Sequence, residues 1–120
     1  MKTIDLKPFK SSATTVFTGR PQGQQVREKL NLESIDKSNE AVEIIIPEDT
    51  TSFNPSFFLG LLFGSIKNLG PQKFKDKYHL KISTQDSELY HVIDKNVQDG
   101  LRNAINTINS KTGLNSMFNF

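Results

Sequence analysis

The sequence contains no cysteine, so it excludes a disulfide framework and thiol chemistry, and it fits a reducing, cytoplasmic setting. The first residues, MKTIDLK, lack the apolar core of a signal peptide, so no secretory leader is expected. The apolar run over 57–66 is shorter than the roughly 20 residues that span a bilayer. We therefore expect a cytoplasmic protein that does not enter a membrane.

The sequence also has almost no excess of one charge sign, because the formal net charge is only +2. The clearest local excess is a group of lysines with one opposing acid: Lys73, Lys75, Lys77 and Lys81 around Asp76. The plain interpretation is a solvated rim. The alternative is a nucleic-acid surface, but such surfaces usually interleave arginine or aromatic residues, and none accompany these lysines. A nucleic-acid partner is not expected.

The sequence has no internal repeat and no low-complexity tract. Its 120 residues predict one domain over 1–120, with a core at about 14–109 and a tail over 110–120 that is short of helix signals. The tail carries Met117, Phe118 and Phe120. These side chains either fold back over the domain's own sheet or serve as an aromatic anchor in a partner's groove.

The most informative stretch is 52–71, which has helix signals at both ends. Asn54 is a good N-cap and Pro55 suits the first helical position. Gly70 predicts a left-handed C-cap, and Pro71 blocks continuation. The helix between them is apolar nearly all round, so it should be buried on more than one side.

One thin stripe of this helix differs, because Ser56, Gly60 and Gly64 follow at four-residue steps and share a face. A helix without bulk on this side can bring its N-terminus close to another surface. A phosphate on Ser56 would be stabilised by free backbone amides and the helix dipole. The plain alternative is a first-turn serine without a special role. The candidate partner-binding residues are Thr50, Thr51, Ser52, Asn54, Ser56 and Gly60.

Strands alternate with helices along the rest of the chain. Strands are predicted over 3–9, 14–18, 42–46 and 78–84, helices over 21–33 and 87–109, and an irregular piece over 72–77. The strand 42–46 contains three consecutive isoleucines and should be buried on both faces, as in a central parallel strand. The pattern predicts a small α/β domain, with an about four-stranded mixed sheet and three to four helices packed on it.

Two segments carry a family resemblance. The first, 17–30, reads FTGRPQGQQVREKL, and the second, 42–70, includes the isoleucine strand and the central helix. Together they resemble the STAS-like domain family of unknown function, which is related in fold to the STAS domains of bacterial anti-sigma factor antagonists. The resemblance implies a STAS-like sandwich without enzymatic activity or cofactor. It implies a regulatory role through a protein partner, either a GHKL-type kinase or ATPase or an anti-sigma-like regulator.

In the antagonists, an Asp-Ser-Ser-Gly-type segment opens the central helix, and a serine kinase of the GHKL class phosphorylates one serine. Ser56 matches a serine of that segment here. Pro55 or Asn54 stands in place of the aspartate, Phe57 replaces the other serine and Phe58 the glycine. The Ser-Phe pair is similar to the helix start of the STAS-like family. The resemblance therefore makes Ser56 the candidate for regulatory phosphorylation.

A second function class is a nucleotide- or anion-binding sensor. Gly19, Arg20 and Gly23 precede a predicted helix, where glycines and an arginine could hold an anion. Their spacing is neither a Rossmann fingerprint nor a P-loop. The alternative is a tight strand-to-helix turn, with Arg20 paired to Glu48 or Asp49.

Support for catalysis is thin. His79 and His91 fall on a strand and a helix, without convergent metal-ligand spacing. Glu48 and Asp49 follow the central strand, at the usual ligand edge of an α/β sheet, but they are a single acidic pair. No catalytic residue, metal or cofactor is therefore expected. A third class, a structural subunit of a larger assembly, stays open, as does the oligomeric state.

Overall fold

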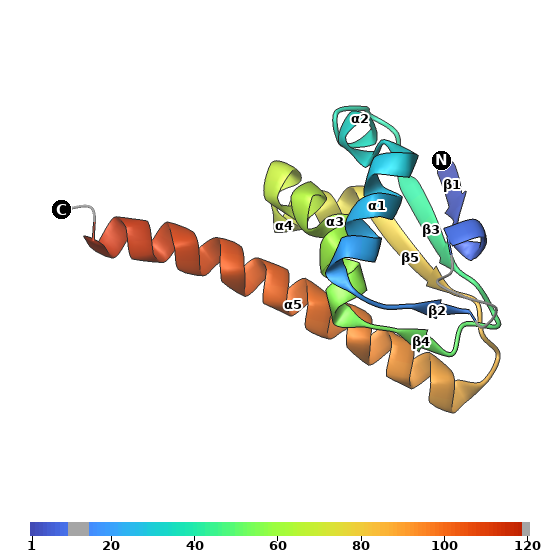
Figure 1. Cartoon of the computed structure of the whole chain (residues 1–120). Coiled ribbons are helices and arrows are strands. Elements are labelled where there is room, and N and C mark those ends of the chain that lie inside the picture. Colours follow the sequence, from blue (N-terminus) through green and yellow to red (C-terminus); the bar gives the residue numbers. More distant parts are fainter. Residues whose placement is uncertain (10–14, 119–120) are drawn as a thin grey trace.

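The computed structural model describes residues 1–9 and 15–118, with side chains for 1–9 and 15–109 (Figure 1). In chain order the elements are β1 (Lys2–Asp5), the 3-10 turn η1 (Lys7–Phe9), β2 (Val16–Phe17), α1 (Arg20–Leu30), α2 (Leu32–Asp36), β3 (Val42–Ile46), β4 (Ser52–Phe53), α3 (Pro55–Leu69), α4 (Pro71–Lys77), β5 (Tyr78–Ile82) and α5 (Ser87–Phe118). The α/β class expected from the sequence is confirmed.

The strands form two small parallel sheets. One has the order β1-β3-β5, with Ile4, Ile44 and Leu80 in register, and the other pairs β2 with β4. The prediction of a single mixed sheet of about four strands was therefore wrong. Each pair is parallel, and its strands are joined by the long helix-containing connection that parallel pairing requires. β2 and β4 are only two residues long before the chain turns into a helix.

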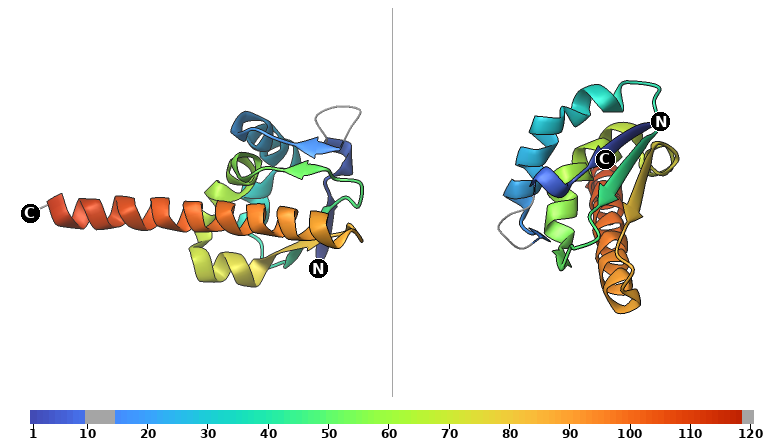
Figure 2. Two further views of the ribbon diagram at one scale, coloured as in Figure 1. Left: turned by 90° about the horizontal axis from the view of Figure 1, so that it is seen from below. Right: turned by 90° about the vertical axis from the view of Figure 1, so that its right-hand side faces the viewer.

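β3 is the central strand of its sheet, as its isoleucines predict. Val42, Ile44 and Ile46 are fully buried, whereas Glu43 and Ile45 on the other face are half-buried. The expectation of burial on both faces was therefore wrong, since the helices cover one face and leave the other open (Figure 2).

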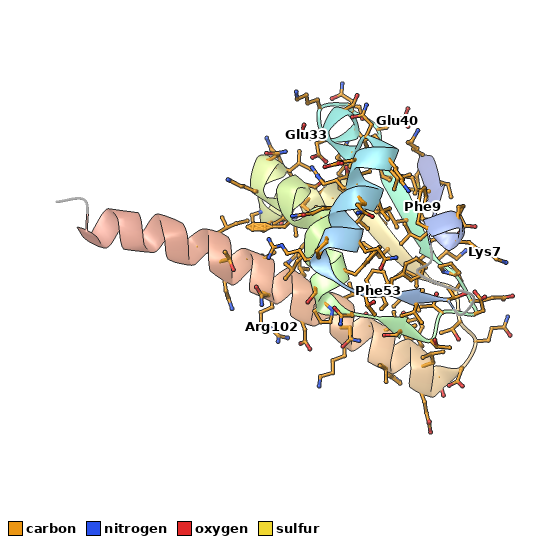
Figure 3. The ribbon with its side chains drawn as sticks, in the orientation of Figure 1. Lys7, Phe9, Glu33, Glu40, Phe53 and Arg102 are labelled. Carbon is orange, nitrogen blue, oxygen red and sulfur yellow. The ribbon has the colours of Figure 1, made fainter. Side chains whose placement is uncertain are left out.

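α3 has the predicted bounds, and the Asn54 side chain caps it by accepting a hydrogen bond from the Ser56 N–H at 2.8 Å. Phe53 of β4, labelled in Figure 3, is fully buried beneath this helix start. The centre of its ring lies 5.9 Å from the centre of the Phe17 ring and 5.4 Å from the centre of the Phe57 ring. This aromatic cluster joins the short β2–β4 sheet to α3.

The region after α3 differs from the prediction. Gly70 has φ 85° and ψ 154°, so its φ is positive but it is not a left-handed C-cap, and Pro71 begins α4 where an irregular piece was expected. Proline breaks a helix from within but suits its first turn. The Gly70–Pro71 pair therefore bends the chain from one helix into the next.

Other boundaries also moved. The helix predicted over 21–33 is divided at Asn31, which adopts the left-handed conformation with φ 52° and ψ 50°. β1 ends at Asp5, whose carboxylate accepts from the Lys7 N–H at 2.9 Å and opens the 3-10 turn. The prediction that this strand continues to Phe9 was therefore wrong.

α5 begins after Asp86, whose Oδ1 accepts hydrogen bonds from the N–H groups of Glu88 and Leu89. It continues to Phe118, so the predicted end of this helix at about residue 109 was wrong. Its C-terminal part extends past the body of the molecule (Figures 1 and 2). The side chains of Met117 and Phe118, and all of Phe120, lie outside the described residues, so neither proposed role of the tail is tested.

Candidate functional site

The N-terminal end of α3 lies at the protein surface. Ser56 and Thr51 are exposed, while Ser52 and Asn54 are half-buried. The adjoining backbone is anchored, because the Asn54 N–H donates to the Phe17 carbonyl at 3.0 Å. We call Thr51, Ser52, Asn54 and Ser56 the α3 edge. It is a surface of small polar groups at the start of a buried helix.

Two of the six residues predicted to bind a partner are not on this surface. Thr50 is fully buried, and no hydrogen bond reaches its Oγ1 within the described part of the chain. Gly60 is also buried, against α1. Their assignment to a partner surface was therefore wrong, because the chain's own packing covers both residues.

Gly60 and Gly23 form the closest contact between α3 and α1. A Cβ built on Gly60 would collide with the Arg20 carbonyl oxygen and lie 2.9 Å from the Gln24 nitrogen. A Cβ on Gly23 would collide with the Phe57 carbonyl oxygen. The small-residue stripe of α3 therefore makes room for another helix of the same domain, so it does not form a free docking face.

The candidate anion site is dispersed in the same way. Gly19 supplies the turn into α1 with φ 89°, and Gly23 is buried at the helix crossing. The Arg20 guanidinium lies 5.2 Å from the centre of the Phe63 ring, in a cation–π arrangement. The predicted pairing of Arg20 with Glu48 or Asp49 is not the arrangement found. The tight-turn interpretation of this segment fits the structure better than a phosphate cradle.

The principal polar cluster is one that the sequence analysis missed. Arg27 donates to Asp36 at 2.9 Å, to the Ser65 hydroxyl at 2.7 Å and to the Leu61 carbonyl at 3.0 Å. The Tyr78 hydroxyl donates to the other Asp36 carboxylate oxygen at 2.6 Å. The Asp36 side chain is only 3% exposed. The cluster ties α1, α2, α3 and β5 together across the interior.

Burial, and then the hydrogen bond to Asp36, raise the pKa of Tyr78 well above its ordinary value of about 10. The phenol therefore stays protonated and keeps donating to the carboxylate. Charge and hydrogen-bonding partners are matched in the cluster, which is the arrangement that stabilises a buried ion pair. No local sequence pattern points to the cluster, because its members are between 9 and 42 positions apart in the chain.

The other ionisable candidates do not converge. His79 and His91 are exposed, with His79 Nε2 3.1 Å from the Asp76 carbonyl oxygen and His91 against the Tyr90 ring. Asp49 accepts from the Thr15 hydroxyl at 2.7 Å. Among residues 1–9 and 15–118, no three or more metal-binding side chains gather.

Comparisons with protein-family models, curated proteins and solved structures found no match to this chain. Within the described residues, no helix has both the length and the apolar character needed to cross a membrane.

Proposed function

We propose that this protein is a STAS-like regulatory domain without enzymatic activity, which binds a protein partner through the α3 edge. One observation carries the proposal. Ser56 is exposed in the first turn of α3, whereas every residue from Phe57 to Leu62 is buried. In the first half of α3, the N-terminal end is therefore the part that is accessible to solvent.

The α3 edge suits recognition by another protein. The Asn54 cap and the hydrogen bond from Asn54 N–H to Phe17 hold the backbone in place, so a partner orders little on binding. Ser52 and Thr51 add hydroxyl groups beside the helix start. The resemblance to STAS-like domains favours a GHKL-type kinase or ATPase, or an anti-sigma-like regulator, as the partner.

The same edge is a candidate switch. A phosphate on Ser56 would lie at the start of α3, where the helix dipole favours negative charge. It would also add up to about two negative charges to the docking surface, which opposes a packed interface by repulsion and desolvation.

Substitution at Ser56 tests the proposal. Wild type, Ser56→Asp and Ser34→Asp are used to capture partners, which are quantified by mass spectrometry, and wild type is inspected for phosphate on Ser56. Ser34 is a matched control because it is exposed on α2, whereas Ser65 is buried in the Arg27 cluster. Ser56→Asp should reduce capture of a GHKL-type partner by about tenfold, with Ser34→Asp unchanged. Equal capture by the two variants, with both folded, would remove the α3 edge from the function.

A further inference from the structure

β5 is an edge strand whose outer side is open. It lies at the end of the β1-β3-β5 order, and in the described part of the chain no further strand pairs with it. The Ser83 N–H donates to the Ile46 carbonyl, so the odd-numbered residues of β5 direct their backbone groups toward β3. The N–H and C=O groups of Leu80 and Ile82 therefore point to the open side.

A groove of about 260 Å³ runs along this edge, between β5 and α5. Its exposed lining is about equally polar and apolar, and the apolar side chains along the strand and the helix are Leu80, Ile82, Tyr90, Val97 and Leu101. Tyr90 is 42% exposed on the helical wall, although it is a large aromatic residue. The groove thus combines unpaired backbone groups with a half-exposed apolar surface.

The charges around the groove are of both signs. Lys75 is one of its lining residues, Lys81 projects from the solvent face of β5, and on that face Glu43 of β3 lies beside His79 in register. Asp94 on α5 is the acid among the groove's lining residues, and Gln98 beside it is neutral. An added strand would lie next to β5 and one strand away from Glu43, so its residues would stand directly beside Lys81 on the solvent face, where acidic side chains form favourable cross-strand pairs.

We propose that the β5 groove binds an extended segment of a partner protein in which apolar and acidic residues alternate. The segment adds a strand to β5 through the backbone of Leu80 and Ile82. Its apolar side chains enter the groove, and an acidic side chain pairs with Lys81. This surface is separate from the α3 edge, and it gives a role to Lys81 of the lysine group that follows α3.

A second copy of this chain is a poorer occupant. Antiparallel pairing of two β5 edges about Leu80 would place Lys81 of each copy opposite His79 of the other. That pairing gives Lys81 no acidic partner, and edge lysines are a common device against self-association. The charges around the edge therefore select an acidic strand over an identical one.

The test uses the full chain and three labelled synthetic peptides, followed by fluorescence anisotropy. The probe is Glu-Val-Glu-Val-Glu-Val-Glu, and the controls are Lys-Val-Lys-Val-Lys-Val-Lys and Glu-Glu-Glu-Glu-Val-Val-Val. Saturable binding is expected for the probe alone. Lys81→Glu should weaken it about fivefold, while Lys29→Glu, exposed on α1, should not change it.

Amide hydrogen exchange supplies a readout that charge alone cannot produce. The probe should slow exchange of the Leu80 and Ile82 amides by about tenfold and leave His79 and Lys81 unchanged. The proposal is overturned if the probe does not saturate, if both acidic peptides bind equally, or if the Leu80 and Ile82 amides are not protected. Protection that rises with protein concentration without peptide would instead identify a second copy as the occupant.

Discussion

Replacement of Gly60 by alanine would add a methyl group at the closest contact of α1 and α3. The added carbon would meet the Arg20 carbonyl oxygen and lie 2.9 Å from the Gln24 nitrogen. Both are backbone atoms of α1, so no side-chain rotation relieves the collision. The two helices must separate, and separation loosens the buried contacts of Val26 and Leu61 beside the crossing.

The magnitude follows from two opposing terms. Overpacking a close contact costs typically 1–3 kcal/mol, and the backbone neighbours place this site at about 3 kcal/mol. Alanine is favoured over glycine in a helix by about 1 kcal/mol. The free energy of unfolding should therefore fall by about 2 kcal/mol, and Tm should fall by about 8 °C.

Urea and thermal unfolding followed by circular dichroism measure this change, with Gly64→Ala as the matched control. The added carbon at Gly64 would meet the Arg27 guanidinium at 3.0 Å, which is a side-chain group held by hydrogen bonds to Asp36 and Ser65. We expect that variant to lose less stability than Gly60→Ala, because a side chain can shift by a few tenths of an ångström whereas the α1 backbone cannot move without the whole helix. If Gly60→Ala is as stable as wild type or Gly64→Ala, the two helices do not cross as closely as described.

Two further stability predictions concern the buried polar groups. Tyr78→Phe leaves one Asp36 oxygen without its donor and should lower the free energy of unfolding by about 1.5–3 kcal/mol in urea titrations at pH 7. An unchanged free energy of unfolding would mean that this hydrogen bond does not contribute to stability. The pKa of Tyr78 is higher in the folded than in the unfolded protein, where it is about 10. The protonated phenol therefore contributes its full stabilisation below pH 10. Between the unfolded and the folded pKa, the free energy of unfolding falls by about 1.4 kcal/mol per pH unit. Tyr78→Phe should lack this part of the alkaline slope, which unfolding at pH 9, 10 and 11 would measure, and equal slopes would contradict it. Thr50→Val replaces a fully buried hydroxyl that has no partner among the residues described and should raise stability by about 1 kcal/mol, whereas a loss of stability would reveal a hydrogen bond at that position.

The elements with strong local signals were predictable from sequence. Asn54, Pro55 and Gly70 define the ends of α3, and the isoleucine run defines β3, because caps and strand formers act on their immediate neighbours. The surface position of Ser56 also agrees with its place in the first turn of α3. The bend at Gly70–Pro71 was misjudged because the same proline can end one helix or begin the next.

The sequence by itself determined where α3 and β3 lie and that strands and helices alternate, since these features depend on residues within a few positions of one another. Only the tertiary structure decided that Gly60 faces Gly23, that Thr50 is buried and that Arg27, Asp36, Ser65 and Tyr78 meet. These contacts join residues between 9 and 42 positions apart, and their geometry depends on how whole helices cross. The division into two sheets and the open edge of β5 have the same origin, because strand order is set by how the connections pack and not by the strands themselves.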